Sequence, residues 1–178
     1  MFIALTGTIG AGKNTVADYL IQKGFSFASG SEIIAAEVKR RHLSVTRENM
    51  RSVANELRSK NANALIDLTI SRVLGADKAA IGFLRTENEV KRLREAVPSA
   101  RLIGIDAPTE LRYERIKNRN EEKDQVTFEQ FVQSEKMEMS ANSPDVQNVG
   151  YCMAHADTIV QNDSTLENLF SSIDALIA

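Results

Sequence analysis

The sequence has few of the residues that form cross-links and metal centres. It contains one cysteine, two histidines and three prolines among 178 residues. The lone Cys152 excludes a disulfide bond within the chain, and so few cysteines and histidines exclude a zinc centre built from them. We expect Cys152 to be a small buried hydrophobic residue, which is how most free cysteines behave.

The sequence also lacks an excess of positive charge and any long apolar run. Its formal net charge is −2, which argues against binding to nucleic acid or to an anionic membrane surface. No apolar run has the length of a membrane span, and the N-terminal segment has neither the basic flank nor the cleavage site of a signal peptide. We expect a soluble, cytoplasmic protein that binds no nucleic acid and no membrane.

What the sequence does contain is an alternation of apolar runs and amphipathic helices. The length and the 43% apolar content suit a single domain, residues 1–178. Runs with the pattern of buried strands lie at 2–6, 25–29, 78–83, 101–107 and 157–162. Helices are predicted at 13–23, 30–42, 47–60, 62–74, 87–97, 108–120 and 164–177, the last capped by Ser164. This alternation predicts a three-layer α/β/α fold around a five-stranded parallel sheet.

Two regions interrupt the regular alternation. Residues from about 30 to 75 place a block of helices between two strands, so we predict a helical insertion there. Residues 121–144 are the most charged and least apolar part of the chain. We predict that they form a mobile helical hairpin or lid within a lid region of about 118–145.

A glycine-rich loop follows the first strand and precedes a helix. The stretch GTIGAGKNT nearly matches the phosphate-loop pattern G-x-x-x-x-G-K-[ST], but the hydroxyl comes one place late. Such a loop turns its backbone N–H groups inward, and the following helix directs its positive end to the same point. We therefore predict a P-loop NTPase fold that binds a nucleoside triphosphate with Mg²⁺. The residues expected to contact the nucleotide are Gly7, Thr8, Ile9, Gly10, Ala11, Gly12, Lys13, Asn14, Thr15 and Val16.

The same loop resembles that of adenylate kinases and their relatives. Their pattern G-x-x-G-x-G-K-G-T has a small residue after the lysine, so Asn14 takes that place and Thr15 matches the family threonine. The opening LTGTIGAGKNTVA is similar to that of dephospho-coenzyme A kinases, and ADTIVQNDSTLENL resembles a stretch near their end. Both resemblances imply phosphoryl transfer from ATP, in which Lys13 is catalytic and Thr15 helps to hold Mg²⁺.

Two further stretches resemble the acceptor side of adenylate kinases. SGSEIIAA is similar to the motif T-G-D-x-L-R-A-A, with Ser29 and Gly30 in matching positions and Ile34 in place of an arginine that grips the acceptor phosphate. The resemblance implies that the helical insertion binds the acceptor. Glu32 is a candidate base or orienting group, and equally a helix cap. Arg58, within the insertion, is a candidate replacement for the lost arginine, with a solvated surface position as the alternative.

IGFLR resembles the adenylate kinase motif D-G-F-P-R. Arg85 is retained, and because it follows a strand at the edge where ligands bind, we expect it to hold the acceptor phosphate as a catalytic residue. The leading aspartate, which would organise Mg²⁺, is replaced by Ile81. Asp106, at the end of the fourth strand, is a candidate substitute. Without any acid, Mg²⁺ would rest on Thr15, the phosphates and water.

The stretch DAPTELRYERIKNR resembles a third segment of the same enzymes, and Arg115 and Arg119 match their lid arginines. Four residues apart on a helix, the two share one face. The resemblance implies that both contact ATP and close over it, which excludes water during transfer. The alternative is a solvated helix face on which Glu110 and Glu114 pair with the arginines.

These observations favour a nucleoside or deoxynucleoside monophosphate kinase. A dephospho-coenzyme A kinase is the alternative enzyme, and a nucleotide-binding regulator without transferase activity is the alternative of another class. The acceptor is expected to be a small phosphate-bearing molecule. The apolar stripe of the C-terminal helix fits a monomer packed on its own sheet and a homodimer equally well.

Overall fold

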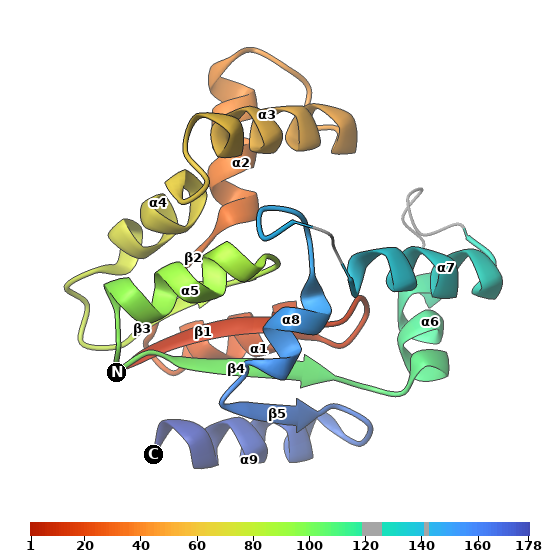
Figure 1. Ribbon diagram of the computed structural model, residues 1–178. Helices are drawn as coiled ribbons and strands as arrows, with labels where there is room; N and C mark the ends of the chain where they lie inside the picture. Colours follow the sequence, from red (N-terminus) through yellow and green to blue (C-terminus); the bar gives the residue numbers. More distant parts are fainter. Residues whose placement is uncertain (119–125, 141–142) are drawn as a thin grey trace.

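The computed structural model describes residues 1–118, 126–140 and 143–178, without the side chains of residues 47, 51 and 55 (Figure 1). The elements in chain order are β1 (Phe2–Gly7), α1 (Lys13–Gln22), β2 (Ser26–Ser29), α2 (Gly30–Arg40), α3 (Arg47–Lys60), α4 (Ala64–Val73), β3 (Ala79–Gly82), α5 (Glu87–Ala96), β4 (Arg101–Asp106), α6 (Thr109–Asn118), α7 (Phe128–Glu138), α8 (Val149–Ala154), β5 (Thr158–Gln161) and α9 (Leu166–Ile177).

The five strands form one parallel sheet in the order β2-β3-β1-β4-β5. β1 lies at its centre and every one of its residues is buried, which explains why this strand is a continuous apolar run without alternation. The predicted five-stranded parallel sheet is confirmed. Because all strands run in one direction, their carboxyl ends meet at a single edge, and ligands bind beyond that edge in such sheets.

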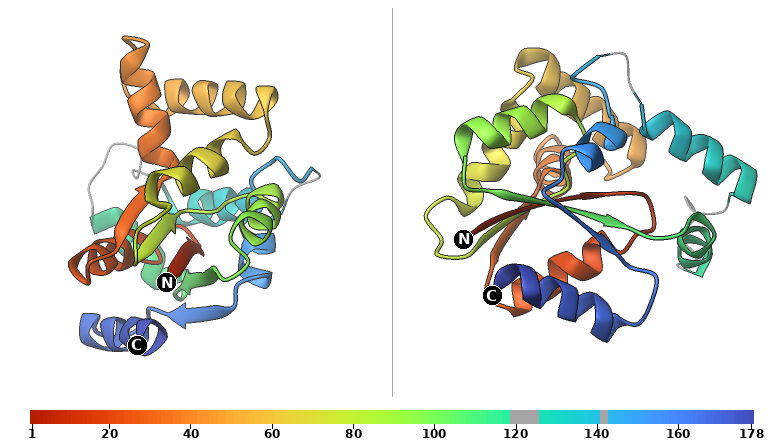
Figure 2. Two further views of the ribbon diagram at one scale, coloured as in Figure 1. Left: turned by 90° about the vertical axis from the view of Figure 1, so that its left-hand side faces the viewer. Right: turned by 60° about the horizontal axis from the view of Figure 1, so that its bottom comes forward.

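Helices cover both faces of the sheet and complete the predicted three layers (Figure 2). On one face, Val16 and Leu20 of α1 and Leu169 and Ile173 of α9 join a buried apolar cluster with the strands. On the other face, α4, α5 and α8 pack on the sheet. Cys152 of α8 belongs to this second cluster and is fully buried, as expected.

The insertion has an apolar core of its own. α2 and α3 lie away from the sheet (Figure 2), and they bury Ile34, Val38 and Val53 between them together with Leu65 of α4. Ile34 is only 8% exposed. Ile34 stands where the adenylate kinase motif has an arginine, and here it is part of the insertion's apolar core. A charged side chain at this position would be costly to bury.

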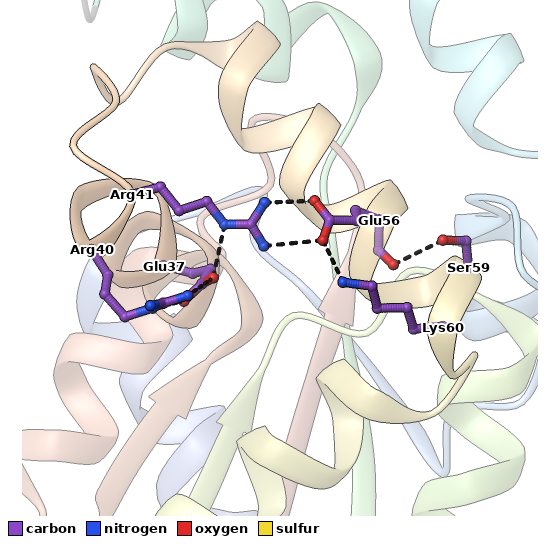
Figure 3. Close-up of polar contacts among 6 residues, drawn as sticks. All are labelled: Glu37, Arg40, Arg41, Glu56, Ser59 and Lys60. Carbon is purple, nitrogen blue, oxygen red and sulfur yellow. Dashed lines mark hydrogen bonds and ion pairs between the residues drawn. The ribbon is translucent and has the colours of Figure 1, made fainter.

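An ion-pair network joins α2 to α3 on the outside of this core (Figure 3). Arg41 donates to Glu37 at 2.8 Å and to Glu56 at 2.5 Å, so it connects one turn of each helix. Arg40 adds a second partner for Glu37, and Lys60 adds one for Glu56. The network restrains the angle between the two helices of the insertion.

The structure corrects one expectation about the C-terminal third and adds a helix there. Ser164 is not the cap of the last helix, because the hydroxyl of Thr165 accepts the hydrogen bond from the Asn168 backbone N–H. The short helix α8 is not predicted by the sequence pattern. Within the predicted lid region, the structure describes one helix, α7. Among the helices described, none is long and apolar enough to cross a bilayer.

Candidate phosphoryl-transfer site

The glycine loop lies at the carboxyl end of β1 and ends at the first turn of α1. Gly10 and Gly12 have φ values of 79° and 97°, a conformation that costs other residues free energy and glycine very little. Gly12 caps α1 without any side-chain hydrogen bond. The first N–H groups of a helix have no acceptor within it, so α1 directs donors and partial positive charge into the loop. This is the geometry of a phosphate site.

Lys13 lies across the loop. Its Nζ donates to the carbonyl oxygens of Gly7 at 2.9 Å and Thr8 at 2.6 Å. The same ammonium group lies 5.9 Å from the ring centre of Phe83, directly after β3. Lys13 is therefore held between the loop and the neighbouring strand. Asn14, by contrast, is exposed on the first turn of α1.

A cleft of about 460 Å³ opens beside the loop. Its wall combines the loop, α6 and the segment after β5, and its lining residues are Gly10, Gly12, Thr15, Arg115, Asn118, Asn162, Ser164 and Leu166. Arg115 donates to the Asn162 side-chain oxygen at 3.4 Å. The structure thus brings Thr15 and Arg115, predicted from separate motifs, to one cleft. Arg119 lies outside the described residues.

On the other side of the loop, Arg85 follows β3 and is half-buried. Its backbone N–H donates to a Glu89 oxygen at 2.7 Å, and its guanidinium has no hydrogen-bond or ion-pair partner among the residues that the structure describes. Arg58 approaches the same Glu89 carboxylate at 3.5 Å. Glu89 is only 6% exposed, so a buried acid connects the Arg85 backbone to the insertion.

Ser29 and Glu32 form the start of α2. The Ser29 hydroxyl accepts from the Glu32 N–H at 3.3 Å, and the Glu32 carboxylate accepts from the Ser29 N–H at 3.1 Å. This reciprocal pair is a capping box. Gly30 lies between them, where a Cβ would come within 3.1 Å of Leu65. Of the two interpretations of Glu32, the capping role is the one for which the structure supplies contacts.

In the part of the chain that the structure describes, the acids near the loop do not assemble a metal site. Within the described ranges, no three acidic, histidine or cysteine side chains gather in one place. Ile81 is fully buried in the sheet. One oxygen of Asp106 accepts from the Thr8 hydroxyl at 2.7 Å, so this acid braces the loop. The residues present fit a Mg²⁺ ion that would arrive with the nucleotide, and Thr15, phosphate oxygens and water would hold it.

Comparison with known proteins agrees with this geometry. The model of the AAA domain family (AAA_18) matches residues 3–140, which is most of the chain and includes the glycine loop, α6 and α7. The chain belongs to the AAA domain family.

Relatives and solved structures are similar to this chain over nearly its whole length. A UPF0200 protein of Methanoculleus marisnigri is 29% identical over 98% of this chain and 94% of its own length. A UPF0200 protein of Thermococcus gammatolerans is 28% identical over 99% and 94%. The shikimate kinase of Acinetobacter baumannii shares the fold with a TM-score of 0.66, at 19% identity over 99% and 92% of the two chains. A gluconokinase of Sinorhizobium meliloti has a TM-score of 0.56, at 12% identity over 98% and 91%. The AAA domain here therefore has a P-loop kinase fold.

Three buried polar residues of this AAA domain site are missing from the sequence-based prediction. Asn162 donates to the Ala11 carbonyl at 2.8 Å, and Arg112 contacts the Ile9 carbonyl at 3.2 Å. Glu89 joins Arg85 and Arg58, as described above. A signal exists for Glu89, because Thr86 and Glu89 have the spacing of a capping box and form one. Asn162 and Arg112 lie inside motifs quoted above, but only burial distinguishes them from their neighbours.

Proposed function

We propose that this protein transfers a phosphoryl group from ATP to a small phosphate-bearing acceptor, most directly a nucleoside or deoxynucleoside monophosphate. The placement of Arg85 supports this most strongly. β3 is hydrogen-bonded to β1, so Arg85 follows the strand beside the one that leads into the phosphate loop. A half-buried guanidinium at that edge is suited to a ligand phosphate, because its planar fork binds two oxygens at once.

The roles of the residues follow from phosphoryl-transfer chemistry. The bond from the γ-phosphorus to the ADP oxygen breaks while a bond to an acceptor phosphate oxygen forms, and the protein aligns the two molecules and neutralises charge. In this proposal the loop and Lys13 hold the triphosphate, while Arg85 and Arg58 hold the acceptor. Arg115 contacts ATP from the cleft side. Arg119, also predicted to contact ATP, lies outside the described residues. Bound Mg²⁺ adds charge neutralisation at the phosphates.

The test is an assay of the purified protein with ATP, Mg²⁺ and a panel of ribo- and deoxyribonucleoside monophosphates. We expect a diphosphate product from at least one of them. Lys13→Ala should abolish turnover, whereas Arg85→Ala should mainly raise the KM for the acceptor, by roughly 10- to 100-fold for a lost charge-assisted contact. Failure of every monophosphate to accept phosphate would reject the proposal.

The alternatives are separated by further arms of the same assay. The buried Asn162, within the stretch that resembles dephospho-coenzyme A kinases, favours dephospho-coenzyme A as an added acceptor. Shikimate and gluconate join the panel because two structural neighbours are kinases named for them. The buried Ile34 and Ile81 favour a regulator without activity. Tight ATP binding with no acceptor-dependent release of ADP would identify that regulator.

A further inference from the structure

Arg112, on the first turns of α6, is a buried arginine in contact with the phosphate loop. Its side chain is 5% exposed. Nε donates to the Ala107 carbonyl at 2.7 Å, and the terminal nitrogens donate to the Ile9 carbonyl at 3.2 Å and the Thr109 hydroxyl at 3.0 Å. Ile9 belongs to the predicted nucleotide site, so the guanidinium holds one side of that loop.

The same guanidinium holds α7. It donates to both oxygens of Glu135, at 3.0 Å for Oε2, and the Glu135 side chain is 15% exposed. The ring of Phe131, also on α7, lies 5.7 Å from the guanidinium carbon. Two-point arginine–carboxylate contacts fix orientation as well as distance. Arg112 therefore connects α7 directly to the loop.

The loop also rests on the backbone beneath this side chain. A Cβ added at Gly10 would come within 2.6 Å of the Arg112 carbonyl oxygen, so the loop and α6 are in close contact. Asp106 lies 3.8 Å from the Arg112 Nε and accepts from the Thr8 hydroxyl. Thr8, Ile9 and Gly10 are thus each held by Arg112 or by the acid beside it.

We propose that Arg112 and Glu135 are a positioning pair that sets the conformation of the phosphate loop from outside the nucleotide site. Arg112 does not reach the phosphates in this arrangement, because its donors are used by carbonyls, a hydroxyl and a carboxylate. It acts through the Ile9 carbonyl and through the packing against Gly10. Glu135 neutralises the buried guanidinium and orients it, so that α7 and nucleotide affinity are coupled. The inference rests on the proposed function in taking ATP as the ligand.

A purely structural pair and a positioning pair respond differently to a double substitution. Removing one partner of a buried pair leaves an uncompensated charge and is strongly destabilising, whereas removing both and replacing them by apolar groups is often tolerated. Arg112→Met combined with Glu135→Leu should therefore regain much of the stability lost by Glu135→Leu alone. The loop would still lack the bond to Ile9, so ATP affinity should stay low.

The experiment compares wild type, Arg112→Met, Arg112→Lys, Glu135→Leu and the double variant. Denaturant unfolding, the dissociation constant for ATP and hydrogen exchange of the amides of residues 8–12 in the nucleotide-free protein are measured for each. We expect the dissociation constant to rise about tenfold for Arg112→Met and for the double variant, which is the range of such coupling. Loop exchange should accelerate in both. Arg112→Lys, which keeps the charge but not the fork, should be intermediate.

Arg94→Met is the matched control. Arg94 also donates to two carbonyls, of Ala100 at 2.7 Å and His155 at 3.3 Å, and to both oxygens of an acid, Asp157, at 2.9 Å. Asp157 accepts from the N–H of Leu102 at the amino end of β4, so this pair lies at the opposite end of the sheet. Its loss should lower stability and leave ATP affinity and loop exchange unchanged.

Recovery of ATP affinity together with stability in the double variant would overturn the inference, as would equal effects of Arg112→Met and Arg94→Met on loop exchange. Where Arg112→Met fails to fold, Arg112→Lys and the double variant decide by the same measurements. A wild-type protein that binds no ATP would contradict the proposed function. The exchange of residues 8–12 in nucleotide-free protein would still decide on the positioning pair.

Discussion

A single buried amide joins the segment after β5 to the phosphate loop. Asn162 is 6% exposed. Its side chain donates to the Ala11 carbonyl and accepts from Arg115. A Cβ at Gly12 would collide with this amide, so the loop lies directly on it. Asn162 therefore contributes to the shape of the loop as well as to the wall of the cleft.

Asn162→Ala should lower the free energy of unfolding by about 1–3 kcal/mol, because the Ala11 carbonyl loses its partner while buried. ATP affinity should fall with it, since the loop loses a support. Denaturant unfolding and titration with ATP measure the two effects. Asn168→Ala is the control, because Asn168 is exposed and, among the described residues, its side-chain amide bonds only the nearby Ser164 hydroxyl, at 2.8 Å. Equal losses in both variants would contradict the prediction.

Among the elements, the pair α2 and α3 depends on charge outside its apolar core. Hydrogen bonds from Arg40 and then Arg41 lower the pKa of Glu37 from 4.5 to about 2. Those from Arg41 and then Lys60 lower the pKa of Glu56 to about 2. A carboxylate with a lowered folded-state pKa stabilises the fold above its unfolded pKa and loses that contribution as the pH falls. The network should therefore weaken between about pH 4.5 and pH 2.

Arg41→Met should loosen α3 relative to α2, because only Arg41 in this network bonds to acids on both helices. Hydrogen exchange of Arg47–Lys60 should accelerate. The denaturant midpoint of unfolding should also fall less between pH 5 and pH 3 in the variant than in wild type. Arg40→Met is the control, since among the described residues the Arg40 side chain bonds only Glu37, on its own helix. An effect of Arg40→Met on α3 exchange as large as that of Arg41→Met would refute this account.

The elements of the fold were largely predictable, because their apolar periodicity is local information. α3 is predicted with its bounds unchanged, and the strands differ by a residue or two. α8 was not predictable, because VGYCMA is a short apolar stretch that contains a glycine. Its helical form depends on packing in the second core cluster. Ser164 and Thr165 offer the same capping chemistry at adjacent positions. Which of the two caps α9 therefore depends on where the helix packs on the sheet.

The site was predictable only where a motif supplies its own geometry. The loop of residues 7–15 carries that information in its glycines and lysine, and the structure places it at the carboxyl end of β1. Arg112 and Arg115 lie on one helix three residues apart, and nothing local shows that Arg112 would be 4% exposed and joined to α7. Burial of that kind depends on contacts between distant segments.

For the molecule as a whole, Cys152 is a probe of global opening. Burial, followed by the charge of Glu89, raises the pKa of the Cys152 thiol from 9.0 to about 12, and its Sγ lies 3.6 Å from the Thr86 carbonyl. The reactive form is the thiolate, which the folded protein therefore disfavours. Between pH 9 and pH 12 the unfolded chain releases this proton and the folded protein keeps it. The free energy of unfolding should therefore fall as the pH rises through that interval.

Alkylation of Cys152 at pH 8 should consequently proceed through unfolding of the whole domain. A ligand that binds only the folded state stabilises it by about 2.7 kcal/mol at 100 times its dissociation constant, so ATP at that concentration should slow labelling about 100-fold. Lys13→Ala should be labelled at the same rate with and without ATP, because it loses the nucleotide. Equal rates for wild type under both conditions would show that α8 opens locally, since local opening exposes the thiol without disturbing the loop.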